Sequence, residues 1–314
     1  MKLIQKTINL LQLVINHLLA SVILMLILFF MIIITYKKFG WIQAIFNLVT
    51  NWIWFIKKEY VLLANFSKKD GHISAIKNKY QEQGCLYLIN NFTKKFSHDG
   101  VIDKNALEEI IFKQIKTVEK AKKRVKKSNS LIYLGFPHVP LGFLDGRLYK
   151  DLDGAILYEY QGMESETLGK GFYELNKKYN TEMELFNNRD KYEELEKEIA
   201  LKIEQSFPIQ NEDIKKTVKV SQILSFGISK PNRWKINNYA QIERYQTEFE
   251  KLLKELKENG VEKIHLFATT PVSLSFSLGR VIQHYHPEII IYNYNNNRFD
   301  WGINLNSKEV IFFT

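Results

Sequence analysis

Two turns in the sequence place small and hydroxylated residues around a proline, directly after a short apolar run. The first turn runs from Gly135 to Pro140 and the second from Ala268 to Ser273. In a parallel α/β sheet, ligands bind beyond the carboxyl ends of the strands, where backbone amides at a helix start can approach a phosphate. Thr269, Thr270 and Ser273 suit this role. The alternative is that Pro140 and Pro271 are ordinary first-turn prolines of structural helices.

Each turn is followed by the same later landmarks. A Gly-Arg pair, Gly146-Arg147 or Gly279-Arg280, comes first, and a Tyr-x-Tyr run, Tyr158 to Tyr160 or Tyr292 to Tyr294, comes next. We favour capping of the last helix carbonyls for the two arginines over contact with a phosphate. One tyrosine of each run is expected in the core.

Familiar catalytic signatures do not occur in the sequence. There is no HExxH, GxSxG, Walker lysine loop, GxGxxG or CxxC motif. His284 and His286 form an HxH pair without a third ligand nearby, which favours a polar helix end over a metal site. We therefore expect no catalytic residue, no metal and no cofactor, and a protein that is not an enzyme.

The elements around these landmarks are repeated. An amphipathic helix, a strand, a proline-led turn, a second helix and a second strand occur at about 103–173 and again at about 237–314. This order predicts a parallel α/β sheet in each copy. Between the copies we expect a charged helix over residues 189–207 and a strand within 217–229. Residues 61–102 are expected to form a helical connector.

The N-terminal part, residues 1–60, has the composition of a transmembrane region. Leu18 to Tyr36 contains no charged residue, and a helical span is expected at about 8–36. The uncharged length disfavours a cleavable signal peptide. Residues 40–56 form either a second span or an interfacial helix, with Gln43, Asn47 and Asn51 as a polar stripe on one side.

The composition indicates which classes of partner and which cellular compartment suit this chain. Its 314 residues carry a net charge of +10, which favours anionic partners such as nucleotides, phosphates or acidic lipids. Cys85 is the only cysteine, which excludes an intrachain disulfide framework and favours a reducing cytoplasm. The basic run from Lys113 to Lys127 is either a solvated helix end or a contact for phosphate or a membrane surface.

The segment "IHLFATTPVSLSFSLGR" followed by "PEIIIYNYN" resembles the C-terminal half of a SAVED domain, a fused pair of CARF-like folds. The resemblance covers about 103–314 and implies an α/β fold of two CARF/Rossmann-like half-domains that form one pocket for a cyclic oligonucleotide. The expected pocket residues are Gly135, Phe136, Pro137, His138 and Tyr160 from one half and Thr269, Thr270, Pro271, Ser273 and Tyr294 from the other.

With transmembrane helices in place of a nuclease, the chain is similar to two-transmembrane SAVED effectors of CBASS anti-phage systems. That similarity implies ligand-driven homo-oligomerisation and disruption of the bacterial inner membrane, with membrane lipid as a partner and the SAVED domain in the cytoplasm. No DNA or RNA polymer is expected to bind. Two alternatives stay open: a type III CRISPR effector that responds to cyclic oligoadenylate, or a membrane-anchored nucleotide-acting enzyme such as a ring nuclease.

Overall fold

The computed structural model describes residues 25–27, 60–68, 73–81, 84–125, 130–150, 154–161, 171–175, 183–232, 236–295 and 298–312. The chain divides into two units, Met1–Lys58 and Glu59–Thr314. The predicted spans at 8–36 and 40–56 lie outside the described residues, apart from a helical piece at 25–27. Across the described ranges, no helix has both the length and the hydropathy to span a bilayer.

The second unit contains two sheets. The first has the strand order β2-β1-β3-β4-β5, and the second β12-β11-β10-β9-β7-β8-β6. The strands of the first sheet are β1 (Tyr60–Phe66), β2 (Leu86–Asn91), β3 (Ser130–Phe136), β4 (Ala155–Gln161) and β5 (Gly171–Glu174). The strands of the second are β6 (Phe186–Asn187), β7 (Glu198–Glu204), β8 (Ile223–Gly227), β9 (Lys263–Thr269), β10 (Glu288–Asn295), β11 (Arg298–Asn304) and β12 (Val310–Phe312).

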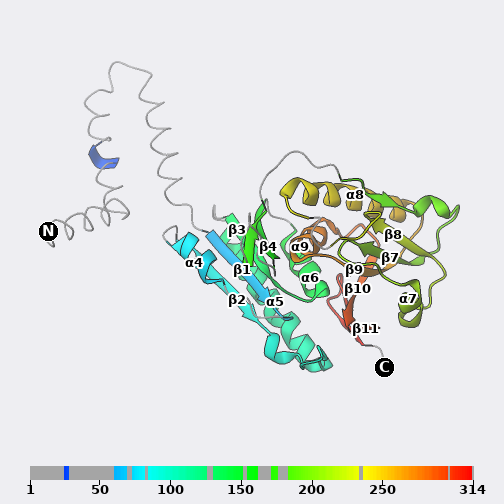
Figure 1. Ribbon diagram of the computed structural model, residues 1–314, viewed down its shortest axis with the longest axis horizontal. Helices are drawn as coiled ribbons and strands as arrows, with labels where there is room; N and C mark the ends of the chain where they lie inside the picture. The colour runs from blue at the N-terminus through cyan, green and yellow to red at the C-terminus, as the bar shows by residue number, and fades with distance from the viewer. Residues whose placement is uncertain are drawn as a thin grey trace, which may run out of the picture. The chain divides into compact units, whose positions relative to one another are not determined.

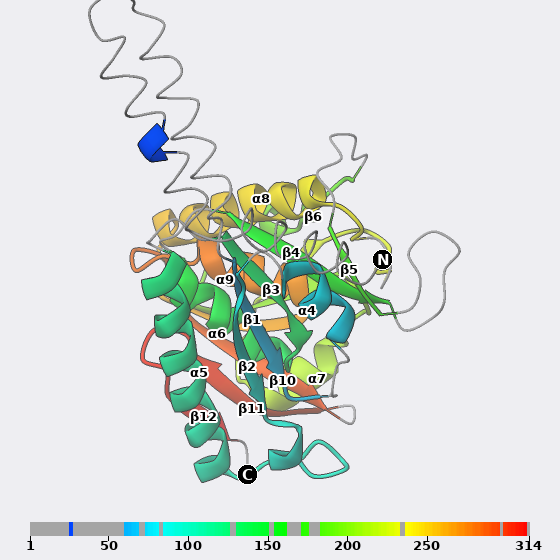
Figure 2. The same ribbon diagram turned by 90° about the vertical axis from the view of Figure 1, so that its left-hand side faces the viewer.

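Six helices accompany the sheets in the described part of this unit. They are α4 (Ser74–Gln81), α5 (Lys104–Val125), α6 (Val139–Tyr149), α7 (Asn211–Thr217), α8 (Tyr239–Glu258) and α9 (Val272–Val281). In both sheets the central strands are parallel, and an antiparallel strand, β5 or β11, follows the last of them. The expected α/β class of two similar halves is confirmed. Figures 1 and 2 show α6 and α9 between the two sheets.

The repeat is longer than the sequence predicts. The series β1-α4-β2-α5-β3-α6-β4-β5 matches β7-α7-β8-α8-β9-α9-β10-β11, and the sheet orders β2-β1-β3-β4-β5 and β8-β7-β9-β10-β11 match as well. The expected halves at about 103–173 and 237–314 therefore each lack their first strand, helix and strand.

The prediction of a helical connector over 61–102 is wrong. This segment holds most of β1, all of α4 and all of β2, and β1 lies between β2 and β3 in the sheet. Residues Val61 to Ala64 are fully buried. A central parallel strand is covered on both faces, so it appears as a short continuous apolar run without the alternation that marks a half-buried strand.

The charged helix expected over 189–207 is also wrong. The structure has a 3₁₀ turn at Arg189–Lys191 and then strand β7, which pairs with β8 on one side and β9 on the other. Ile199, Leu201 and Ile203 are fully buried. Burial in the centre of a sheet outweighs the weak helical preference of the surrounding Glu and Lys residues. The strand expected within 217–229 is confirmed as β8.

The halves meet where α6 packs against α9 with no space for side chains at two glycines. A Cβ atom on Gly146 would lie 1.9 Å from the carbonyl oxygen of Phe276, and one on Gly279 would lie 2.2 Å from that of Phe143. The contact is reciprocal, as a twofold relation between the halves requires. Arg147 donates to the carbonyl of Ile282 at the end of α9, so it caps the helix of the other half rather than its own.

Candidate ligand-binding site

A cavity of about 290 Å³ lies beyond the carboxyl ends of the parallel strands of both sheets. Its walls come from the residues that follow β1, β3, β7 and β9 and from the last residues of β4 and β10. This is the position at which open parallel sheets bind ligands.

Equivalent positions in the two halves contribute to the cavity in pairs. The β1–β3 register in the first sheet matches the β7–β9 register in the second. Tyr60 pairs with Ser130 at the start of the first register, and Glu198 pairs with Lys263 at the start of the second. The β3–β4 and β9–β10 registers match in the same way. With these registers aligned, the lining pairs are Lys68 and Ser206, Phe136 and Thr269, Pro137 and Thr270, Val139 and Val272, Glu159 and Asn293, and Tyr160 and Tyr294. The cavity therefore straddles the approximate twofold relation between the halves.

The structure brings seven of the ten predicted residues together. They are Phe136, Pro137, Tyr160, Thr269, Thr270, Pro271 and Tyr294. The other three, Gly135, His138 and Ser273, are next to the lining in sequence but have different roles.

Gly135 faces the neighbouring strand rather than the cavity. Its φ is +146°, and a Cβ atom there would lie 2.0 Å from the carbonyl oxygen of Asn65 on β1. Glycine is required because a side chain would meet the neighbouring backbone. This residue shapes the turn before α6 and is not among the residues that line the cavity, and its contact with a ligand stays a prediction.

His138 is buried behind the cavity wall. Its backbone N–H donates to Ser67 Oγ over 2.7 Å, and the Ser67 hydroxyl lies 2.8 Å from His138 Nδ1. Burial, and then the charge of Lys68, lowers the pKa of His138 well below its usual range. The imidazole is stacked on Phe96 and does not line the cavity, and its contact with a ligand stays a prediction.

Ser273 is fully buried at the start of α9, where it binds a carboxylate. Its backbone N–H and its Oγ donate to Glu159 Oε2 over 3.1 and 2.6 Å. Glu159 belongs to β4 of the other half, and its Oε1 accepts the N–H of Tyr160. Burial raises the pKa of this carboxyl. The amides expected to meet a phosphate are occupied by Glu159, which ties the first half to the second.

The cavity has little net charge. Among its lining residues, all of them in the described ranges, Lys68 is the single cation and Glu159 the single carboxylate. The remaining polar groups are hydroxyls and amides, and Thr270 Oγ1 lies 2.8 Å from Ser275 Oγ. A ligand with phosphates and bases would be held mainly by neutral donors and by aromatic surface.

Aromatic residues of the lining offer that surface. Tyr160 packs edge-on against Phe136, with ring centroids 4.3 Å apart. Tyr294 is 37% exposed, and its hydroxyl lies 3.5 Å from Asp213 Oδ2. Tyr158 and Tyr292, their partners in the Tyr-x-Tyr runs, are buried, which confirms that one tyrosine of each run belongs to the core.

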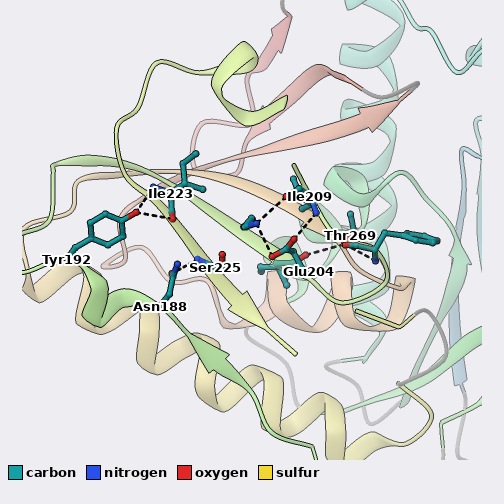
Figure 3. Close-up of polar contacts among 10 residues, drawn as sticks. Asn188, Tyr192, Glu204, Ile209, Ile223, Ser225 and Thr269 are labelled. Carbon is teal, nitrogen blue, oxygen red and sulfur yellow. Dashed lines mark hydrogen bonds and ion pairs between the residues drawn. The ribbon is translucent and has the colours of Figure 1, made fainter. Parts of the chain in front are cut away.

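The segment after β7, which includes Ser206 and Phe207, forms one wall of the cavity. Hydrogen bonds hold it in place (Figure 3). Glu204 accepts the N–H of Ile209 over 2.7 Å and forms an ion pair with Lys202 over 3.1 Å. Thr269 Oγ1 donates to the carbonyl of Phe207 over 2.6 Å. Phe207, 54% exposed, is thereby held at the rim as a further aromatic face.

Ten residues of the lining were not individually predicted, although Val139, Ala268 and Val272 lie in the two turns that the sequence indicated. The ten are Lys68, Val139, Glu159, Tyr173, Ser206, Phe207, Ala268, Val272, Ser275 and Asn293. Glu159 and Asn293 are the middle residues of the Tyr-x-Tyr runs, so the repeat alone could have indicated them. Lys68, Ser206 and Phe207 follow strands that the sequence did not reveal. No group of three or more potential metal ligands occurs within the described residues.

The fold and cavity define an α/β protein of two similar halves that share one cavity. The family described as "SMODS-associated and fused to various effectors sensor domain", SAVED, matches residues 113–305, so the chain belongs to the SAVED family. Among curated proteins, none matches the chain significantly.

Solved structures with a similar fold include Cap4 SAVED/CARF-domain containing receptors. The Acinetobacter baumannii receptor with the cyclic trinucleotide 3'3'3'-cAAA has 15% identity and a TM-score of 0.51, over 84% of this chain and 56% of that one. The form with 2'3'3'-cAAA has 17% identity and a TM-score of 0.47, over 80% and 54%. The Moraxella osloensis receptor has 13% identity and a TM-score of 0.47, over 80% and 52%. This chain spans about half the length of these receptors, and the likeness concerns the fold.

Proposed function

We propose that the chain is a membrane-anchored effector that senses a cyclic oligonucleotide through its SAVED domain. Binding drives several copies together and disrupts the bacterial inner membrane in anti-phage defence of the CBASS type. The nucleotide is bound without being consumed, the SAVED domain lies in the cytoplasm, and no metal or cofactor takes part.

The observation that carries the sensor part is the cavity between the halves. Six pairs of equivalent residues line it at the carboxyl ends of parallel strands, as expected for a ligand shared by two fused halves. Exposed aromatic faces such as Tyr294 and Phe207 suit the stacking of bases. Membership of a family of sensor domains and a similar fold seen with cyclic trinucleotides support the same ligand class.

The membrane part rests on the sequence. Leu18 to Tyr36 is uncharged and long enough to cross the hydrocarbon core. Gln43, Asn47 and Asn51 lie on one side of the following segment, and polar side chains in a bilayer favour contact with each other or with water. Clustering of several copies would let these side chains line a path for solutes.

The direct test is a titration of the purified full chain in detergent or nanodiscs with 3'3'3'-cyclic triadenylate and 2'3'3'-cyclic triadenylate. We expect saturable binding, with the nucleotide recovered intact by chromatography after prolonged incubation. Failure of both compounds and of cyclic dinucleotides and tetranucleotides to bind would contradict the sensor assignment. Steady loss of intact ligand would instead support the ring-nuclease alternative.

A further inference from the structure

The two halves differ strongly in charge at one equivalent helix. α5 precedes β3 as α8 precedes β9, and the buried residues of the two helices have the same spacing. In order, Leu107, Ile110, Gln114, Val118 and Ala121 of α5 correspond to Ile242, Tyr245, Phe249, Leu253 and Leu256 of α8. Both helices therefore pack their inner faces alike, and differences on their outer faces are not required by the fold.

The outer face of α5 is basic where that of α8 is not. Residues 113–124 of α5 include six basic residues and one acidic residue, Glu119, whereas the matching residues 248–259 include three basic and four acidic residues. Basic residues in a last turn stabilise a helix through its dipole. α8 has a single one there, Lys257, so the dipole does not account for the cluster on α5.

Three of these lysines lie along one exposed stripe with an aromatic residue. The stripe consists of Phe112, Lys116, Lys120 and Lys123, all of them exposed. Phe112 is 57% exposed, and Lys116 Nζ lies 4.1 Å from its ring centroid. Lys116 and Lys120 are four residues apart, and like charges at this spacing slightly destabilise a helix. The stripe therefore carries a small cost for the isolated helix that an anionic partner would offset.

The Lys123 end of the stripe lies near the amino edge of the first sheet, where the chain enters this sheet as β1. Tyr60, the first residue of β1, pairs in parallel with Ser130, the first residue of β3. α5 ends at Val125, five residues before Ser130, so its last turn lies near the start of β1. Figure 2 shows α5 running along this sheet. Lys57, Lys58 and Glu59 join the apolar N-terminal region to Tyr60 in the sequence. The cavity lies at the opposite, carboxyl edge of the sheet.

We propose that the stripe Phe112, Lys116, Lys120 and Lys123 binds the headgroups of anionic phospholipids at the bilayer from which the chain emerges. Lysine side chains near an anionic membrane surface are attracted to it. An aromatic side chain can enter the boundary between headgroups and acyl chains. The contact lays α5 lengthwise along the membrane surface, with the Lys123 end of the stripe nearest the start of β1. This inference rests on the proposed membrane attachment.

The test places a fluorophore on the stripe of the full chain. On a Cys85→Ser background, Glu119→Cys introduces a single exposed cysteine between the lysines, and Lys254→Cys provides the matching position on α8. Each protein is labelled and reconstituted into vesicles that contain lipids with a spin label on the headgroup. We expect quenching at position 119 in phosphatidylglycerol-containing vesicles, much less in pure phosphatidylcholine, and little at position 254 in either.

Charge variants then separate contact with lipid from mere proximity. Lys116→Glu, Lys120→Glu and Lys123→Glu together should abolish the dependence of quenching on phosphatidylglycerol. The control Lys251→Glu, Lys254→Glu and Lys257→Glu makes the same change of charge on exposed lysines of α8 and should preserve it. Quenching at position 119 that is equal in both lipids, or unchanged by the first triple, would overturn the proposal. So would a stripe that binds a short DNA duplex but shows no lipid-dependent quenching.

An alkaline carbonate wash of the same vesicles tests separately whether the N-terminal region is inserted in the membrane. Protein that washes off but shows quenching dependent on phosphatidylglycerol supports the stripe and contradicts the anchor. Protein that resists the wash without such quenching contradicts the stripe and leaves the anchor in place.

Discussion

Gly146 on α6 lies so close to Phe276 on α9 that a Cβ atom would come within 1.9 Å of the Phe276 carbonyl oxygen. Gly146→Ala should therefore force the two helices apart and lower the free energy of unfolding. Overpacking in a well-packed core typically costs about 1–3 kcal/mol. Denaturant unfolding of the full chain in detergent would measure the loss, and titration with cyclic triadenylate would show whether the cavity is disturbed as well.

Alanine substitutions at the other two glycines of this contact should lower stability by different amounts, because the space around each glycine differs. Gly279→Ala meets backbone at 2.2 Å and should be about as harmful as Gly146→Ala, whereas Gly142→Ala meets the Ser275 side chain at 3.0 Å and should cost less. If all three variants were equally stable, direct backbone packing would not be what joins the halves.

The bond between Glu159 and Ser273 should stabilise the fold more than a neutral hydrogen bond does. Ser273→Ala removes the 2.6 Å donor to a buried carboxylate, and hydrogen bonds to charged groups are worth about 1.5–3 kcal/mol. Ser275→Ala is the matched control on the same helix, because Ser275 Oγ donates to the neutral carbonyl of Pro271. Unfolding at mildly alkaline pH should show the larger loss for Ser273→Ala. The reverse order would mean that the carboxyl of Glu159 is not ionised in the fold.

Asp145 should make stability fall as the pH rises towards neutrality. It is fully buried on α6 and accepts hydrogen bonds from Asn65, Gln114 and Tyr133. Burial nevertheless raises its pKa to about 7, whereas the pKa of an aspartate in an unfolded chain is about 3.9. The folded state then holds a proton that the unfolded state has released. This contribution is complete below about pH 4 and is lost as the pH rises through about 7.

Asp145→Asn removes this titration. Over that pH window, the free energy of unfolding of the variant should decrease less steeply than that of the wild type, by up to about 1.4 kcal/mol per pH unit. If the free energy of unfolding changed with pH equally steeply in the two proteins, Asp145 would be ionised in the folded state, held so by its three hydrogen-bond donors.

Tyr294 should contribute a stacking surface to ligand binding. Base stacking on an aromatic side chain is worth about 1–3 kcal/mol, so Tyr294→Ala should weaken binding of cyclic triadenylate by roughly 5- to 150-fold. Tyr294→Phe keeps the ring and should bind nearly as well as the wild type. Tyr285→Ala, which removes an exposed tyrosine that does not line the cavity, is the control. Equal affinities for all four proteins would exclude stacking on Tyr294.

The polar stripe of the N-terminal region should be needed for membrane disruption but not for sensing. Replacing Gln43, Asn47 and Asn51 by leucine should leave membrane insertion intact, because leucine is favourable in lipid, and leave nucleotide binding intact. Dye-loaded liposomes should leak on addition of ligand to the wild type and leak little with the triple variant. Equal leakage would assign the disruption to the first apolar segment or to clustering alone.

Local patterns in the sequence predict the second part of each half well. Proline-led turns, Gly-Arg pairs and Tyr-x-Tyr runs are determined by neighbouring residues, and they correctly indicate β3-α6-β4 and β9-α9-β10. Seven cavity residues were predicted because they directly follow or end these strands.

The first part of each half depends on pairing between distant segments. β1 is recognisable mainly through its register with β3, and β7 through its place between β8 and β9. No alternation marks β1, and the charged residues around β7 suggested a helix. Lys68, Ser206 and Phe207 follow these two strands and were missed for that reason. The occupation of the α9 amides by Glu159 was equally hidden, because the two residues that bind are 114 positions apart.

The packing of α6 against α9 also has a consequence for how the protein responds in a cell. In a receptor whose site is shared by two separate subunits, dilution dissociates the subunits and the site is lost, so apparent affinity depends on how much protein is made. Here both walls belong to one covalent chain, and their effective concentration is set by the connection between them. The cavity thus persists in a single molecule, and its formation does not depend on how much of the protein is made.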